Sequence, residues 1–80
     1  MISDRQRGEL IRDIILSVAV IGMFGFTRRA NIITLYYTLC QFNRHKKLVQ
    51  SDFVSLVEEL DGKRINEYSF KVDNGFLILF

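Results

Sequence analysis

Apolar and polar positions near the start of the chain follow the period of an α-helix. Apolar residues recur at intervals of one, three and four positions: Leu10, Ile11, Ile14, Ile15 and Val18. Polar residues of the same segment fall on the other side: Arg5, Glu9, Arg12 and Asp13. Ser3, with Gln6 three residues later, matches a capping box, and Asp4 suits the positive end of a helix dipole. The spacing predicts an amphipathic helix.

The next segment, Ile14–Phe26, is apolar at nearly every position and contains two glycines near its end, Gly22 and Gly25. A helix that spans a membrane needs about 20 apolar residues, and this segment has 13 residues. We therefore expect a buried helix that ends near the glycines, followed by a short extended piece, "MFGFT", at residues 23–27. A membrane-associated helix over Ile14–Phe26 is the alternative.

A second helix is predicted from Thr27, whose side chain can cap it. Polar residues recur three or four positions apart: Asn31, Thr34, Thr38 and Gln41. Apolar residues form the opposite face: Ile32, Leu35, Tyr36, Leu39 and Phe42. The residues of "IITLYYT" would also suit a strand, but the three-four-three polar spacing favours a helix.

The third helix is predicted to begin near Ser51 and to end at Gly62, which suits a left-handed C-terminal cap. Its apolar positions follow the helical pattern without a break: Phe53, Leu56, Val57 and Leu60. Its solvent side is polar: Ser55, Glu58 and Glu59.

A β-hairpin is predicted for the remaining residues, with Asn74-Gly75 as its two-residue turn. Pairing across this turn puts Asp73 opposite Phe76 and Val72 opposite Leu77. The first strand then has one apolar and one polar face, as strict alternation requires.

One face of this hairpin is unusually apolar for a surface. It carries Phe76, Ile78 and Phe80 beside Lys71 and Ser69. An exposed apolar strand edge invites pairing with another chain. We expect either another element of the same chain or a partner, most simply a second copy, to cover it. Phe76, Ile78 and Phe80 are therefore a candidate interface.

The order helix, short extended piece, helix, helix, hairpin resembles that of a winged helix-turn-helix domain. The resemblance covers nearly the whole chain: "MFGFT" corresponds to the first strand, and "VQSDFVSLVEELDGKRI" to the third helix running into the wing. It implies an α+β fold of three helices and a C-terminal hairpin, in which the first strand joins the hairpin. It also implies DNA binding.

Two features depart from that family. The connection "NRHKKLVQ" between the second and third helices is longer than the usual turn of three or four residues. The third helix usually enters the major groove, yet its exposed side carries Asp52, Glu58 and Glu59, which phosphates repel. Domains of this shape also mediate protein contacts, and a fold does not fix a function.

Composition supports one intracellular domain. The chain has 80 residues, of which 49% are hydrophobic, which predicts a single domain over residues 1–80. One cysteine, Cys40, excludes an intrachain disulfide and favours a reducing compartment, the cytoplasm. Because a short chain commonly buries more apolar surface by oligomerisation, we expect a homodimer.

Positive charge is concentrated in the middle of the chain. Residues 28–47 hold five basic residues and no acidic one, whereas residues 48–80 hold three basic and six acidic residues, a balance of −3. Basic side chains bind nucleic acids mainly by neutralising phosphates. The predicted phosphate contacts are Arg28, Arg29, Arg44, Lys46 and Lys47, with Lys63 and Arg64 assisting at the base of the wing.

Ion pairing within the protein is the alternative for these cations. The three that follow the second helix are favoured by its dipole even without a ligand. Arg28 and Arg29, at the opposite end of that helix, are not. They contact either phosphates or the carboxylates of Glu58 or Glu59.

Other candidate chemistry is sparse. His45 is the single histidine and lies in the basic loop, where we expect it to be solvated. Cys40 is expected to pack as a small apolar residue. No phosphate-binding glycine motif and no pair of catalytic carboxylates is evident. We expect no enzyme activity, no cofactor and no metal.

These patterns predict a small cytoplasmic DNA-binding regulator of winged-helix type. The alternative is a protein-interaction module, an inhibitor or modulator of a larger partner, that docks through its C-terminal strand or its acidic third helix.

Overall fold

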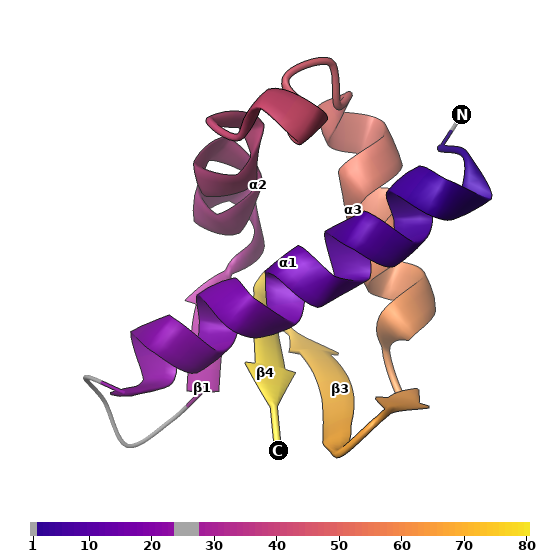
Figure 1. Cartoon of the computed structure of the whole chain (residues 1–80). Helices are drawn as coiled ribbons and strands as arrows, with labels where there is room; N and C mark the ends of the chain where they lie inside the picture. The colour runs from indigo at the N-terminus through magenta and orange to yellow at the C-terminus, as the bar shows by residue number, and fades with distance from the viewer. Residues whose placement is uncertain (1, 24–27) are drawn as a thin grey trace.

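The computed structural model describes residues 2–23 and 28–80. This part of the chain forms three α-helices, a short 3₁₀ turn and a four-stranded antiparallel sheet (Figure 1). The elements are α1 (Asp4–Met23), β1 (Arg28–Asn31), α2 (Ile32–Cys40), η1 (Asn43–His45), α3 (Gln50–Leu60), β2 (Arg64–Ile65), β3 (Tyr68–Asp73) and β4 (Phe76–Leu79). The expected α+β fold, three helices followed by a hairpin, is confirmed.

The local signals for α1 and α3 act as predicted. The Ser3 hydroxyl accepts a hydrogen bond from the Gln6 backbone N–H at 3.2 Å. The four apolar positions of α3 are buried, and Gly62 has a positive φ of 79° shortly after this helix ends. Although α1 contains much of the apolar segment Ile14–Phe26, the described residues include no helix that is both long and apolar enough to span a membrane.

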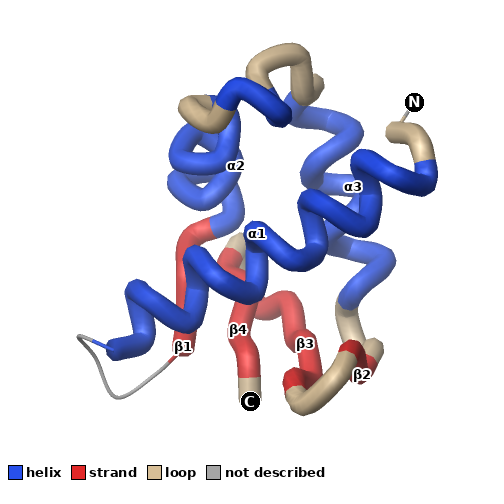
Figure 2. Tube along the Cα trace, in the orientation of Figure 1, coloured by secondary structure: helices blue, strands red, loops and turns tan. Residues whose placement is uncertain are grey.

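β3 and β4 form the predicted hairpin in the predicted register. Asp73 pairs with Phe76 and Val72 with Leu77. Both residues of the Asn74-Gly75 turn have a positive φ, 49° and 78°, as a type I′ turn requires. The strand order is β1-β4-β3-β2, so β4 is an interior strand (Figure 2).

The hydrophobic core lies between one face of the sheet and the helices, with α1 running across the sheet (Figure 1). The helices contribute Leu10, Ile14, Val18, Ile32, Leu35, Leu39, Phe53, Leu56, Val57 and Leu60. The sheet contributes Ala30, Phe70, Leu77 and Leu79. Each large apolar side chain buried here stabilises the fold by about 1.5–3 kcal/mol. A one-residue slip would turn the buried strand residues to solvent, so this face fixes the register.

The first strand and the start of the second helix differ from the prediction. Residues 24–27 of "MFGFT" lie outside the described residues, and the strand that joins the sheet is residues 28–31. α2 begins at Ile32 instead of near Thr27. Its N-cap is Asn31, whose Oδ1 accepts hydrogen bonds from two backbone N–H groups of the first turn at 3.0 and 3.2 Å.

β1 covers the strand edge that was expected to need a partner. The pairing of β1 with β4 begins at Arg28, which lies opposite Leu79, and ends at Asn31, opposite Phe76. The Ile32 N–H donates to the Gly75 carbonyl at 2.9 Å, which ties the hairpin turn to the start of α2. Because β4 has a strand on each side, a second copy cannot pair with its edge, and only its outer side-chain face is open.

Candidate functional site: a basic cleft between α1 and η1

Basic side chains from two distant parts of the sequence line an open cleft of about 440 Å³, the basic cleft. The start of α1 contributes Ser3, Arg5, Gln6 and Glu9. The segment at η1 contributes Asn43, Arg44, Lys46 and Lys47. Four of the lining side chains are cationic and one is acidic, so the cleft is locally positive.

The remaining lining groups also favour an anion. The acidic residue, Glu9, has its Oε1 3.5 Å from Nε of Arg5, so its charge is already compensated. Ser3, Gln6 and Asn43 add uncharged hydrogen-bonding groups. The first turn of α1 borders the cleft, but its partial positive charge is already offset in part by Asp4, and its Gln6 N–H donates to the Ser3 hydroxyl, so the cations supply the positive charge of the cleft.

His45 holds the basic segment against α1. Its ring is fully buried, and its Nε2 donates a hydrogen bond to Oδ2 of Asp13 at 2.7 Å. The Asp13 carboxylate is itself nearly buried, with 8% of the residue exposed. Nη1 of Arg44 lies 3.7 Å from the same oxygen. This hydrogen bond joins the middle of α1 to η1 across 32 positions of the sequence.

The predictions for His45 and Asp13 were therefore wrong. His45 is not solvated, and Asp13 lies on the buried side of α1, between the turns that carry Leu10 and Ile14. Their mutual hydrogen bond offsets the cost of burying two polar groups. The His45 Nδ1 is buried without a hydrogen-bond partner in the described part of the chain. A ring with its proton on Nε2 leaves only a lone pair, and no N–H, at that position.

A second hydrogen bond holds the far end of the basic segment. The Tyr36 hydroxyl donates to the Leu48 carbonyl at 2.7 Å. A hydrogen bond with Cys40, together with burial, raises the pKa of the Tyr36 hydroxyl further above its ordinary value, which already leaves it a protonated donor at neutral pH. The cations between His45 and Leu48 are therefore presented from a backbone that is held at both ends.

Arg28 and Arg29 do not line the basic cleft. They lie on β1, where successive side chains point to opposite faces of the sheet. Cζ of Arg28 is 5.6 Å from the centroid of the Tyr68 ring, and Cζ of Arg29 is 4.0 Å from that of Phe76. Both guanidinium groups make cation–π contacts. The prediction that these arginines lie at the start of the second helix was wrong, because they are in β1.

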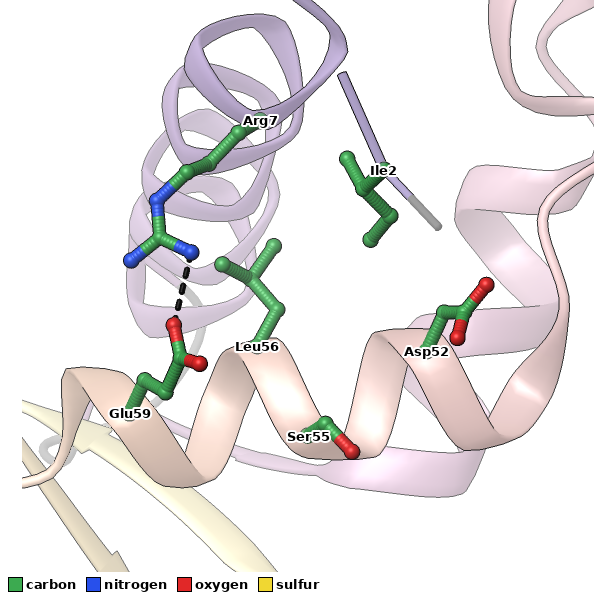
Figure 3. Close-up of a pocket in the computed structure, with 6 residues that line it drawn as sticks. All are labelled: Ile2, Arg7, Asp52, Ser55, Leu56 and Glu59. Carbon is green, nitrogen blue, oxygen red and sulfur yellow. Dashed lines mark hydrogen bonds and ion pairs between the residues drawn. The ribbon is translucent and has the colours of Figure 1, made fainter. Parts of the chain in front are cut away.

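Glu59, one of the two carboxylates expected to pair with Arg28 or Arg29, is paired with another arginine. Oε2 of Glu59 lies 2.6 Å from Nη1 of Arg7, across a pocket of about 220 Å³ between α1 and α3. Figure 3 shows the Arg7 guanidinium reaching past Leu56 to this carboxylate. The acidic side of α3 is therefore partly neutralised by α1.

Lys63 and Arg64, the last of the predicted cations, follow α3 at the end away from η1. The eleven residues of α3 span about 16 Å, because an α-helix rises about 1.5 Å per residue. The structure therefore brings together Arg44, Lys46 and Lys47 of the predicted set and adds Arg5 to them. It places Arg28, Arg29 and Arg64 in strands of the sheet and Lys63 in the connection just before β2.

An apolar groove of about 330 Å³ lies between α1 and α2, with Ser17 and Thr38 in its lining. Leu16 and Val20 of α1 border it and are 57% and 56% exposed, and Phe42, just after α2, is 45% exposed. Neighbouring exposed apolar side chains of this size are typical of contact surfaces.

No protein-family model, curated protein or solved structure matches the chain. Its function must be inferred from the geometry and charge of the described residues.

Proposed function

We propose that this chain is a small nucleic-acid-binding regulatory protein of winged-helix type that holds the phosphate backbone of duplex DNA in its basic cleft. The observation that supports this most is the convergence of four cations and three uncharged polar side chains on one cleft. Cationic side chains neutralise phosphates, and uncharged polar side chains can donate hydrogen bonds to their oxygens.

The order of elements supports the winged-helix part of the proposal. A strand between the first two helices lies beside the C-terminal hairpin, as the resemblance implies. The mode of contact differs from the one usual for that family. The exposed side of α3 carries Glu58 and Glu59, and the hairpin turn follows Asp73, so neither element suits a phosphate backbone. The cleft contacts phosphates, and contacts to phosphates position a protein on DNA but do not distinguish one base sequence from another.

The test is a fluorescence anisotropy titration of a labelled mixed-sequence duplex with the wild-type chain. We expect saturable binding, with a dissociation constant of about 1–100 µM at physiological salt, the range of binding that rests on phosphates alone. Binding should tighten as salt is lowered. A duplex that stays unbound at low salt would exclude the proposed function.

Association with a second copy is a second candidate function, favoured by the apolar groove between α1 and α2. An exposed apolar patch on a helix can pair with itself across a two-fold axis. Light scattering of the wild-type chain should give the mass of two chains, and a Leu16→Glu variant that of one. A single-chain mass for the wild type at the highest attainable concentration would rule this homodimer out.

A further inference from the structure

The outer face of the sheet combines aromatic and basic side chains. Residues paired across neighbouring strands point to the same face. On the outer face, Ile78 of β4 lies between Arg29 of β1 and Lys71 of β3. Phe76 and Phe80 flank Ile78 along the same strand direction, since side chains alternate with a period of two.

The same face extends to β2 at one end. Phe80 and Ser69 exchange two backbone hydrogen bonds at 2.8 and 3.1 Å. Ser69 pairs in turn with Arg64 of β2. The outer face therefore holds an apolar and aromatic central strand with cations on the strands around it. We call this set, Arg29, Arg64, Lys71, Phe76, Ile78 and Phe80, the sheet platform.

The sheet platform is accessible. Phe80 is 68% exposed, and Arg29, Arg64 and Lys71 are exposed. Phe76 and Ile78 are half-buried. The helices pack on the opposite face, where Phe70, Leu77 and Leu79 are buried in the core.

The charge of the platform selects its partner. The platform has three cations, and two acidic residues border it: Asp73 at the hairpin end and Glu67, which has the same alternation as Ser69 and Lys71, at the turn between β2 and β3. A second copy of the chain would bring the same three cations against them, and like charges oppose such pairing. A polyanion has the complementary charge. The exposed ring of Phe80 further favours a polyanion that also carries flat apolar groups, because a phosphate group makes no favourable contact with an aromatic ring.

We propose that the sheet platform binds single-stranded nucleic acid. Phe80 stacks on one base, and the Arg29 guanidinium, already lying 4.0 Å from the centre of the Phe76 ring, offers a second stacking surface. Lys71 and Arg64 neutralise the phosphates that run past the central strand. Phe76 and Phe80 are about 13 Å apart along β4, which accommodates a few nucleotides. Duplex bases are stacked inside and cannot reach such rings, so the ligand is a single strand.

This site is separate from the basic cleft and does not depend on the duplex binding proposed above. Labelled oligo-deoxythymidine and oligo-uridine, which do not pair with themselves, are suitable probes. The strand that binds more tightly identifies DNA or RNA as the source. We expect Phe80→Ala to weaken binding of that strand by about 10-fold, the loss of one stacked base. Phe80→Leu should weaken it similarly, because leucine keeps the apolar contact but has no ring.

Two further variants make this test specific. Tyr37→Ala removes another exposed aromatic ring, on α2, and should leave single-strand binding unchanged. Lys71→Glu changes an exposed side chain of the platform and should weaken binding even if the Phe80 variants fold poorly. Duplex binding should survive Phe80→Ala. The proposal is overturned if neither strand binds, if folded Phe80→Ala and Phe80→Leu bind as the wild type does, or if Tyr37→Ala has the same effect.

Discussion

A His45→Leu variant is expected to lose about 3 kcal/mol of its free energy of unfolding. Leucine is close to histidine in volume, and slightly larger, but it cannot donate a hydrogen bond to Asp13. The carboxylate would then stay buried with only Arg44, at 3.7 Å, to compensate its charge. Because a domain of this size has a total stability of about 5–15 kcal/mol, the loss should be obvious in urea denaturation as a lower midpoint.

The double variant Asp13→Leu/His45→Leu distinguishes the stability lost with this hydrogen bond from the stability lost through changed packing. Replacing a buried polar pair by apolar residues of similar volume is often neutral or stabilising, whereas removing one partner is costly. We expect the double variant to recover most of the stability lost by His45→Leu. If His45→Leu alone is as stable as the wild type, the buried hydrogen bond does not hold η1 against α1.

Reversing two cations of the basic cleft is expected to weaken duplex binding on the order of 100-fold at low salt, because two phosphate attractions become repulsions. The variant is Lys46→Glu/Lys47→Glu, whose side chains are exposed, so the fold should be unaffected. The matched control is Lys63→Glu/Arg64→Glu, which changes the net charge equally at the other end of α3. It should weaken duplex binding much less. Equal losses would mean that overall charge, and not the cleft, drives binding.

The parts of the fold that the sequence predicts are those that local signals determine. The apolar spacing of α3 and the Asn74-Gly75 turn act over a few residues, so both were correct. The position of β1 could not be predicted, because "RRAN" at residues 28–31 has no strand propensity of its own. Residues 28–31 are a strand because β4 offers an unpaired edge, and Asn31 can then cap α2.

In the candidate site too, residues with a local sequence signal could be predicted, and residues that the fold brings together from distant segments could not. Arg44, Lys46 and Lys47 were recognisable from the charge of their own segment. Arg5 was not, since it lies far away in the sequence and α1 balances its cations with acids. The burial of His45 was also unpredictable from its charged neighbours, because its partner is 32 residues away. One signal was present: Asp13 follows Leu10 by three positions and adjoins Ile14, so a helix turns it toward the core.

The salt dependence of duplex binding tests the central claim most directly, because its slope counts the phosphates that the protein neutralises. A log–log plot of affinity against salt should fall with a slope between about −1.8 and −3.6 for the wild type. Lys46 and Lys47 contribute about 0.9 each, and Arg5 and Arg44, which also pair with Glu9 and Asp13, contribute at most the same again. Lys46→Gln/Lys47→Gln should make the slope shallower by about 1.8, and Lys63→Gln/Arg64→Gln should change it much less. A wild-type slope near zero, or one that the cleft variant does not change, would contradict phosphate binding in the basic cleft.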